Sequence, residues 1–348
     1  MKKILSLVLL AVLAFSLVAC GGNNEPNEGG NEGGNAGSAA TYTLGMGVVS
    51  NANSSETNLA QIDSTVAAVV LDAEGKIVYL RLDAMQNKMD ITDGQVEMDR
   101  TWQTKRELGD DYNMVKYSDA TMEWDAQAVA FEDWAQGKTI DEIKNTPTTV
   151  NDHGYTVSAD DTLYAGCTIQ IVDFVDAVVK AGNDPWAVTF TTDGAFTVGV
   201  AVIGSVDAQT KATTADENGE AHMYTEYAAA VVGSDGKVLA ALHDMIQPEI
   251  YFDMNGEIAG STVKPTKREL GEDYNMVKYS DAIAEWDAQS KAFTDYCVGK
   301  TAAEIAGIET AVNDHGYTVA VDEALLAGCT IQISGAKAVV SKAATIAR

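Results

Sequence analysis

The chain contains one long segment twice, and this internal repeat constrains the fold more than any other feature. TKRELGDDYNMVKYSDA at 104–120 recurs as TKRELGEDYNMVKYSDA at 266–282, and NDHGYTV and AGCTIQI recur at the same offset of 162. Without a gap, 47 of 68 positions are identical between 104–171 and 266–333. Repeats of about 150 residues are large enough to bury their own cores, unlike the units of a solenoid. We therefore expect two tandem copies of one domain.

Upstream of these identical stretches the similarity weakens but persists, which sets the domain limits. AAVVLDAEGKIV from Ala67 corresponds to AAAVVGSDGKVL from Ala228, and TLGMGVV from Thr43 corresponds to TVGVAVI from Thr197. We place the two modules at 41–182 and 195–343, joined near Gly182–Pro185.

The pattern inside each module predicts an α+β fold, a small sheet with helices. Val66–Leu71 and Ile77–Leu82 flank a turn and are typical of a β-hairpin. Ser118 or Asp119 can cap a helix that runs to Gln136. Further elements are expected in the second half of the module: capping boxes for short helices at Thr139–Glu142 and Thr301–Glu304, strands at Val157 and Thr168–Ile171, and a helix at Phe174–Ala181.

The first forty residues predict a secreted, membrane-anchored protein. Lys2 and Lys3 precede an apolar run from Ile4 to Val18, which is typical of a signal peptide and shorter than a spanning helix needs. Leu17–Cys20 resembles a bacterial lipobox, which implies a signal peptide at 1–20 and lipid on Cys20. Residues 21–40 are rich in Gly and Asn and predict a flexible linker. We expect a protein anchored to the extracytoplasmic face of the cell membrane.

The net charge excludes one class of partner. With 51 acidic and 23 basic side chains, the chain has a formal charge of -28. Such a chain offers little attraction to a phosphate backbone, so we expect no nucleic-acid partner. Its hydrophobic content of 46% is that of a globular protein rather than of a disordered acidic tail.

One motif in each module carries the functional prediction. Asp160 precedes Ala-Gly-Cys-Thr at 165–168, and Asp322 precedes the same four residues at 327–330. An Ala/Val-rich segment follows in both copies. The pattern resembles the FMN-binding domains of extracytoplasmic electron-transfer proteins. With the lipobox and two modules, the chain is similar to the PplA-type flavinylated lipoproteins of Gram-positive extracellular electron transfer.

The resemblance assigns a role to each residue of the motif. In that family FMN is joined through a phosphoester to the last threonine by a separate flavin transferase, which implies covalent FMN on Thr168 and Thr330. The small residues and the acidic residue would complete the cofactor site: Gly166, Gly328, Cys167, Cys329, Asp160 and Asp322. Gly166 and Gly328 would let the backbone approach the phosphate. Two features depart from the family pattern, since Ala165 and Cys167 stand where the family has Ser/Thr and Ala, and Asp160 lies farther upstream.

The implied function is electron transfer rather than catalysis. FMN passes one or two electrons, and a covalent bond prevents its loss outside the cell. The protein would take electrons from a membrane donor and pass them to extracellular acceptors. The alternative is a cofactor-free surface lipoprotein whose duplicated module binds a ligand or has an adhesive role. In the second case Thr168 and Thr330 are ordinary strand residues.

Other candidate residues each have a structural and a functional interpretation. Three aromatic pairs can flank a flavin or can belong to the core: Trp124 and Trp286, Tyr112 and Tyr274, Tyr155 and Tyr317. The cysteines preceding Thr168 and Thr330 are reactive thiols or buried small residues, and Cys297 and Cys329 can form a disulfide. His153 and His315 lie in Asn-Asp-His-Gly turns, and no His/Cys spacing indicates a metal site.

Overall fold

The computed structural model describes residues 39–348, in which strands and helices are mixed. The predicted α+β class is confirmed. The described residues 39–348 lie in one compact unit. The signal peptide at 1–20, Cys20 and nearly all of the predicted linker lie outside the described residues, so these predictions are not tested. None of the helices in 39–348 has the length and apolar character needed to cross a membrane.

The first copy contributes an antiparallel sheet whose strands run in the order β4-β3-β2-β1-β7. The predicted hairpin is confirmed, because Leu71 pairs with Ile77, but both of its strands extend well beyond the predicted range. The strands are β1 (Ala40–Asn51), β2 (Leu59–Leu71), β3 (Ile77–Thr92), β4 (Gln95–Val96) and β7 (Val188–Thr192). β7 lies in the segment that joins the two modules, and it pairs with β1.

The second copy contributes a similar antiparallel sheet built around the long strand β9. β8 pairs with one edge of β9, while β10 and β11 pair with different lengths of β9, and β12 follows β11. The strands are β8 (Phe196–Val206), β9 (Gly219–Gly233), β10 (Val238–Ile246), β11 (Glu249–Phe252) and β12 (Ile258–Thr262).

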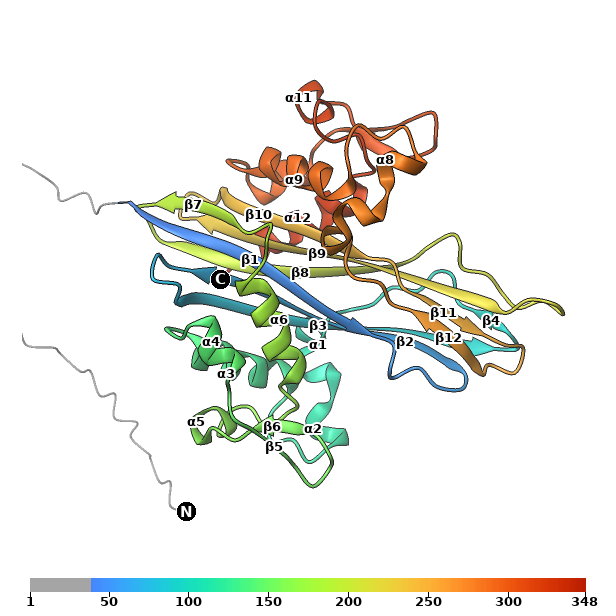
Figure 1. The fold of residues 1–348 in the computed structure, drawn as a ribbon, viewed down its shortest axis with the longest axis horizontal. Coiled ribbons are helices and arrows are strands. Elements are labelled where there is room, and N and C mark those ends of the chain that lie inside the picture. The colour runs from blue at the N-terminus through green and yellow to red at the C-terminus, as the bar shows by residue number, and fades with distance from the viewer. Residues whose placement is uncertain (1–38) are drawn as a thin grey trace, which may run out of the picture. The chain divides into compact units, whose positions relative to one another are not determined.

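The helices cover the outer faces of the two sheets (Figure 1). Those of the first copy are α1 (Lys105–Leu108), η1 (Gly109–Tyr112), α2 (Met114–Tyr117), α3 (Trp124–Ala135), α4 (Ile140–Lys144), α5 (Asp161–Tyr164) and α6 (Val172–Gly182). Those of the second are α7 (Lys267–Leu270), η2 (Gly271–Tyr274), α8 (Met276–Tyr279), α9 (Trp286–Cys297), α10 (Ala302–Ala306), α11 (Glu323–Leu326) and α12 (Ser334–Thr345). Two small hairpins complete the copies: β5 (Thr148–Val150) with β6 (Thr156–Ser158), and β13 (Thr310–Val312) with β14 (Thr318–Ala320).

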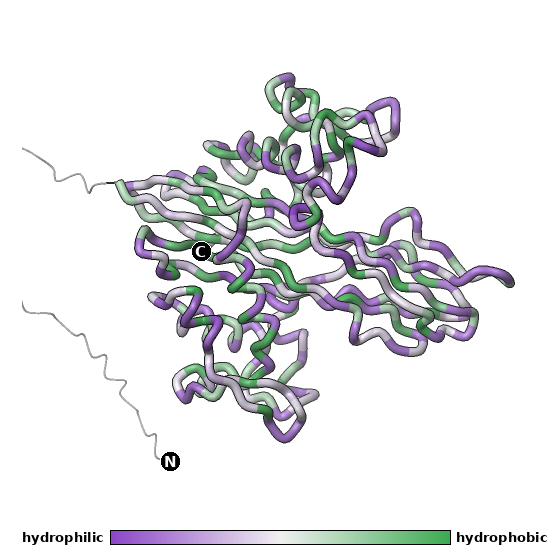
Figure 2. The backbone as a smooth tube through the Cα atoms, in the orientation of Figure 1, coloured by the Kyte–Doolittle hydropathy of each residue, from purple (hydrophilic) through white to green (hydrophobic). Residues whose placement is uncertain are grey.

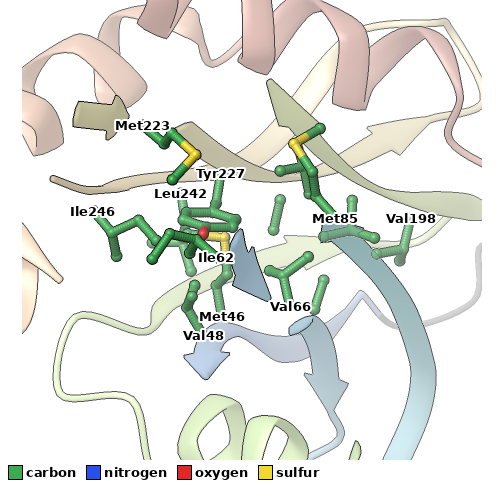
Figure 3. Packing of buried hydrophobic residues seen from close by; sticks show 14 of the residues in the cluster. Met46, Val48, Ile62, Val66, Met85, Val198, Met223, Tyr227, Leu242 and Ile246 are labelled. Atoms are coloured by element: carbon green, nitrogen blue, oxygen red, sulfur yellow. The ribbon is translucent and has the colours of Figure 1, made fainter. Parts of the chain in front are cut away.

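The two sheets pack face to face through a core that both copies share. Met46, Ile62 and Met85 of the first sheet lie against Met223, Tyr227 and other buried residues of the second (Figure 3). Separate cores lie between each sheet and its own helices. Hydrophobic residues accordingly follow the central strands, and hydrophilic residues gather at the turns (Figure 2). The two sheets form a sandwich with helices on both outer faces.

Reciprocal ion pairs connect the copies across this core. Lys180 of the first copy contacts Glu269 of the second at 2.6 Å, and Lys342 of the second contacts Glu107 of the first at 2.7 Å. These four residues are two equivalent pairs in the repeat. A contact that recurs with the partners exchanged is the signature of a two-fold, isologous interface. The copies therefore pack as the subunits of a symmetric dimer would.

Glycines allow the long helices to lie directly on the strands. A Cβ on Gly45 would lie 1.9 Å from the carbonyl oxygen of Ala181 in α6, and a Cβ on Gly199 would lie 2.0 Å from that of Ala343 in α12. Both glycines stand at the same place in the TLGMGVV and TVGVAVI segments. Any larger residue here would push the helix away from the sheet.

Four local predictions are confirmed and two are wrong. The capping boxes at Thr139 and Thr301, the strand at Val157 and the helix at Phe174–Ala181 are present. The helix predicted to start at Ser118 or Asp119 begins at Trp124, because the Ser118 hydroxyl donates to the Met114 carbonyl and closes α2. Thr168–Ile171 forms no strand, because the Thr168 amide bonds a side chain of α3.

Candidate functional site

Thr168 and Thr330 lie in equivalent loops, between α5 and α6 and between α11 and α12. Both are partly exposed. The Thr168 amide donates to Oε1 of Gln127 at 2.8 Å, and its hydroxyl lies 3.2 Å from the same oxygen. Thr330 repeats both contacts with Gln289, at 2.8 and 3.1 Å. The two threonine hydroxyls are thus held in one position, each in a partly exposed loop.

The two glutamines were missed in the sequence and are the residues that position the threonines. Both are fully buried, Gln127 on α3 and Gln289 on α9. Nε2 of Gln127 donates to the Met122 carbonyl at 2.9 Å and lies 3.6 Å from Sδ of Met114. Because the amide nitrogen is anchored, Oε1 must face the threonine loop. The sequence Trp-Asp-Ala-Gln is identical in both copies and is followed by differing residues, a signal that could have identified these glutamines.

Asp160 and Asp322 cap the short helices that precede the threonine loops. Oδ1 of Asp160 accepts from the amides of Thr162 and Leu163 at 2.9 and 3.0 Å. Asp322 makes the same two bonds at the start of α11. An aspartate that accepts from the second and third amides is a standard N-cap. The local fold thus gives both residues a structural role.

Gly166 and Gly328 allow the threonine loop to lie against the long helix of its own copy. A Cβ on Gly166 would lie 2.8 Å from Cβ of Ala130, and one on Gly328 would lie 2.9 Å from Cβ of Ala292. Neither glycine has a positive φ. The close approach of helix and loop therefore explains these glycines by packing.

The three described cysteines are buried free thiols, which agrees with the structural interpretation. Cys167, Cys297 and Cys329 form no disulfide, so the Cys297–Cys329 pairing is absent. Burial raises the pKa of Cys167 and of Cys297 to about 12, and that of Cys329 to about 11. Thiols of this kind are protonated at neutral pH and react slowly.

A lysine occupies the space between two of the aromatics that were predicted to flank a flavin. Nζ of Lys105 lies 4.8 Å from the ring centre of Tyr112 and 5.5 Å from that of Trp124. Lys267 lies in the same way between Tyr274 and Trp286, at 4.7 and 5.2 Å. Trp124 and Trp286 are only 3% and 4% exposed. These tryptophans are core residues, as the structural interpretation had it.

Tyr155 and Tyr317, by contrast, are exposed, on the hairpins next to α2 and α8. Their exposed fractions are 55% and 56%. Tyr117 and Tyr279, which end α2 and α8, are exposed to 76% each. Nε2 of His153 lies 3.6 Å from the Asp119 carboxylate, which brings the first hairpin turn beside the segment that follows α2.

Glutamates connect α2 and α8 to the helices that carry the glutamines. The carboxylate of Glu123, just before α3, accepts from the amides of Met114 and Val115 at 2.7 and 3.1 Å. Glu285 makes the same bonds to Met276 and Val277. α2, the start of α3 and the threonine loop are therefore one continuous hydrogen-bonded unit in each copy.

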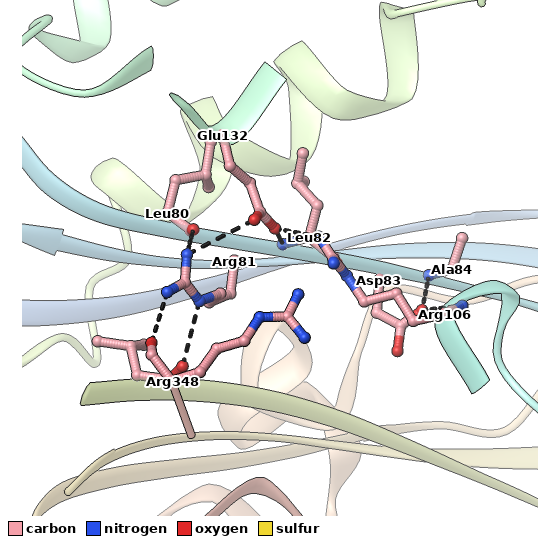
Figure 4. Close-up of polar contacts among 9 residues, drawn as sticks. Leu80, Arg81, Leu82, Asp83, Ala84, Arg106, Glu132 and Arg348 are labelled. Carbon is pink, nitrogen blue, oxygen red and sulfur yellow. Dashed lines mark hydrogen bonds and ion pairs between the residues drawn. The ribbon is translucent and has the colours of Figure 1, made fainter. Parts of the chain in front are cut away.

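Arg106 and Arg268, which correspond to each other in the repeat, find different partners. In the first copy the Glu132 carboxylate accepts from Arg106 and from the Leu82 amide, and lies 3.5 Å from Arg81 (Figure 4). In the second copy Thr294 replaces Glu132. Arg268 instead reaches both oxygens of Asp184 at 2.9 Å. Asp184 belongs to the connection between the modules, so this pair fixes the connection to the second copy.

The second copy also holds a buried polar cluster that the first copy lacks. His243 lies between the Ser290 hydroxyl, 2.9 Å from Nδ1, and the Glu226 carboxylate, 2.8 Å from Nε2. The serine is buried and also lies 3.2 Å from the His243 carbonyl. In the first copy Leu82 stands in place of the histidine, Ala128 in place of the serine and Thr65 in place of the glutamate. A serine enclosed in this way is not accessible to a substrate, so we assign the cluster to packing.

A cavity of about 300 Å³ lies between the copies, and four of its five charged lining residues form two ion pairs, while the fifth, Asp244, accepts from the backbone amides of Met245 and Arg268. Lys180 pairs with Glu269, and Arg268 with Asp184. Within residues 39–348, no group of three or more His, Cys, Asp or Glu side chains is arranged to hold a metal ion.

Comparisons with models of known protein families, with curated proteins and with solved structures found no match for this chain.

Proposed function

We propose that this protein is a lipid-anchored electron carrier of the extracytoplasmic membrane face, with two copies of an FMN-binding-like module and FMN bound covalently to Thr168 and Thr330. The observation that carries the proposal is the position of the two hydroxyls. Each lies in a partly exposed loop rather than in a strand, and each is oriented by a buried glutamine. A modifying transferase needs a hydroxyl that it can reach and that keeps a fixed position.

The surrounding residues fit a flavin that lies on the surface rather than one enclosed in the core. The tryptophans are buried and the space beside them holds a lysine. Gly166 and Cys167 pack toward α3 and the core. The exposed Tyr155 and Tyr317 remain available to cover a ring. FMN, when bound, supplies one- and two-electron redox chemistry.

In this proposal the chain itself is a carrier and not an enzyme. A flavin transferase attaches the cofactor, a membrane donor reduces it and extracellular acceptors oxidise it. The lipid on Cys20 keeps the body near its donor. The reciprocal packing of the copies would give two equivalent flavin positions, one on each copy.

The experiment is co-expression with a flavin transferase, followed by intact mass measurement and in-gel flavin fluorescence after denaturation. Two adducts are expected on the wild type. Thr168→Ala and Thr330→Ala should each remove one, while Thr162→Ala, at an exposed threonine that precedes the loop, should remove none. Adducts that persist in the Thr168→Ala/Thr330→Ala variant would show that the sites are elsewhere.

A second candidate function is a cofactor-free binding lipoprotein, and a specific observation favours it. Packing or capping accounts for every motif residue other than the threonines: the aspartates cap helices, the glycines contact alanines and the cysteines are buried. A wild-type protein without adducts, taken from a host that carries a flavin transferase, would favour this candidate and exclude the first.

A further inference from the structure

Each copy carries an exposed tyrosine patch, of which the proposed function uses only Tyr155 and Tyr317. The first patch consists of Val115, Tyr117 and Tyr155, and the second of Val277, Tyr279 and Tyr317. All six side chains are at least 45% exposed, and Tyr117 and Tyr279 reach 76%. In the first copy the patch combines α2 with the neighbouring hairpin of β5 and β6 (Figure 1).

Identity between the copies is informative here because these residues are exposed. Surface substitutions rarely change stability by more than about 0.5 kcal/mol, so packing does not require them to stay the same. Several exposed positions outside the patches have diverged, for example Val129 to Lys291 and Tyr164 to Leu326, although Val150 and Val312 are exposed and identical. Even buried positions have diverged, such as Ala128 to Ser290. The patches are identical, which indicates contact with something outside the chain.

The charge around each patch selects the chemistry of that partner. Four exposed acids and one lysine adjoin the patch residues along the chain in each copy, so their summed charge is -4 + 1 = -3. They are Asp110, Asp111, Asp119, Asp152 and Lys116 in the first copy, and Glu272, Asp273, Asp281, Asp314 and Lys278 in the second. Tyrosine rings bind cations through their faces, and tyrosine is enriched at protein interfaces.

The chain itself shows that these rings accept a cation. Nζ of Lys116 lies 4.7 Å from the ring centre of Tyr117, and Lys278 lies 4.7 Å from that of Tyr279. A second copy of this chain is a poor occupant, because an isologous contact would bring the two acidic rims together. We propose that each patch binds a Lys/Arg-bearing segment of a partner protein, and that one chain holds two such segments.

Each patch is also connected to the threonine loop of its copy. Glu123 accepts from the amide of Val115, and Gln127 contacts both Met114 and Thr168. A partner on the patch would therefore contact the same hydrogen-bonded unit that holds the threonine. The patches consist of side chains outside the motif, so binding of a partner to them does not require FMN.

The test measures binding of a fluorescent oligolysine peptide by anisotropy, with the full chain in non-ionic detergent and no flavin transferase in the expression host. We expect two peptides per wild-type chain and one per chain for Tyr117→Ser or Tyr279→Ser. The double variant should bind about tenfold more weakly. Tyr164→Leu, which replaces an exposed tyrosine outside the patches by the residue of the other copy, should bind as the wild type does.

The double variant separates the patches from the net charge, since it leaves every charge in place. Binding by the double variant equal to that of the wild type would overturn the proposal and attribute binding to the overall charge. Dimers of the wild type in light scattering that the double variant lacks would also overturn it, in favour of a second copy as the occupant. Tyr117→Phe and Tyr279→Phe should keep binding, because they keep the rings. Circular dichroism verifies that each variant is folded.

Discussion

Replacing Glu132 should destabilise the first copy more than any other single loss of charge within it. Its carboxylate accepts from the Leu82 amide at 2.6 Å, pairs with Arg106 and lies 3.5 Å from Arg81. Glu132 is 2% exposed, and the two arginines are 13% and 15% exposed. Removing one partner of a buried ion pair costs about 3–5 kcal/mol, since the remaining charge stays buried without compensation.

Two substitutions separate the lost charge from the lost hydrogen bond. Glu132→Gln keeps an oxygen for the Leu82 amide, and we expect a loss of about 3 kcal/mol. Glu132→Thr introduces the residue found at Thr294 in the other copy and also removes that oxygen, so we expect about 4–5 kcal/mol. The control is Asp295→Asn, which breaks an exposed pair with Lys291 and should change the free energy of unfolding by about 0.5 kcal/mol or less.

Urea unfolding followed by far-UV circular dichroism measures these differences. A lower midpoint with an unchanged slope is expected for both Glu132 variants. Adding Arg106→Leu to Glu132→Thr should cost less than the sum of the two single changes, because the uncompensated guanidinium is removed with its partner. A Glu132→Thr protein within about 1 kcal/mol of the wild type would refute the reasoning.

Three further predictions concern packing, pH and thiol chemistry. Gly166→Ala should destabilise the protein by about 1–3 kcal/mol because its Cβ meets Ala130, and adding Ala130→Gly should restore much of the loss in the same urea assay. Burial raises the pKa of Asp83 from 3.8 to about 6, so the folded protein binds this proton more tightly than the unfolded chain does. The resulting stabilisation is fully present below pH 3.8 and is lost as the pH rises through about 6. Asp83→Asn should remove a difference of about 3 kcal/mol between the free energies of unfolding at low and neutral pH. A free energy of unfolding that depends on pH in the variant as it does in the wild type would contradict this. Iodoacetamide should label the buried cysteines Cys167, Cys297 and Cys329 only after unfolding, as measured by mass spectrometry. Labelling of these cysteines in the native protein would contradict their burial.

Local sequence patterns predicted the elements whose causes are local. The hairpin around Asp72–Lys76 and the capping boxes at Thr139 and Thr301 depend on neighbouring residues, and all are present. Ser118 resembles a helix cap, yet its hydroxyl donates to the Met114 carbonyl and closes the preceding helix, α2. The first amide of α2 is capped by Glu123, which lies nine residues further along the chain. A contact of that kind leaves no local pattern.

The shared core was not predicted, although the sequence carries a signal for it. β2 is buried along nearly its whole length, and Val66–Leu71 is a continuous apolar run without alternation. Such a run is typical of a strand covered on both faces. Helices of one copy cover only one face, so the other face requires a second layer. The other copy supplies that layer, which the repeat alone did not reveal.

The candidate site was predicted at the threonines but not around them. Thr168 and Thr330 were expected from the motif, and they occupy equivalent loops. The glutamines that orient them lie 41 residues earlier in the chain, and only the folded structure brings them together. The motif predicted a cofactor role for Asp160 and Gly166, and capping and helix contact account for these residue types as well.

The most direct test of the central claim is peptide mapping of the protein taken from its native cell surface. We predict the mass of an FMN phosphoester on the peptide that contains Thr168 and on the peptide that contains Thr330, and on no other peptide. Unmodified threonines in both peptides, from cells whose other lipoproteins carry FMN, would contradict the account.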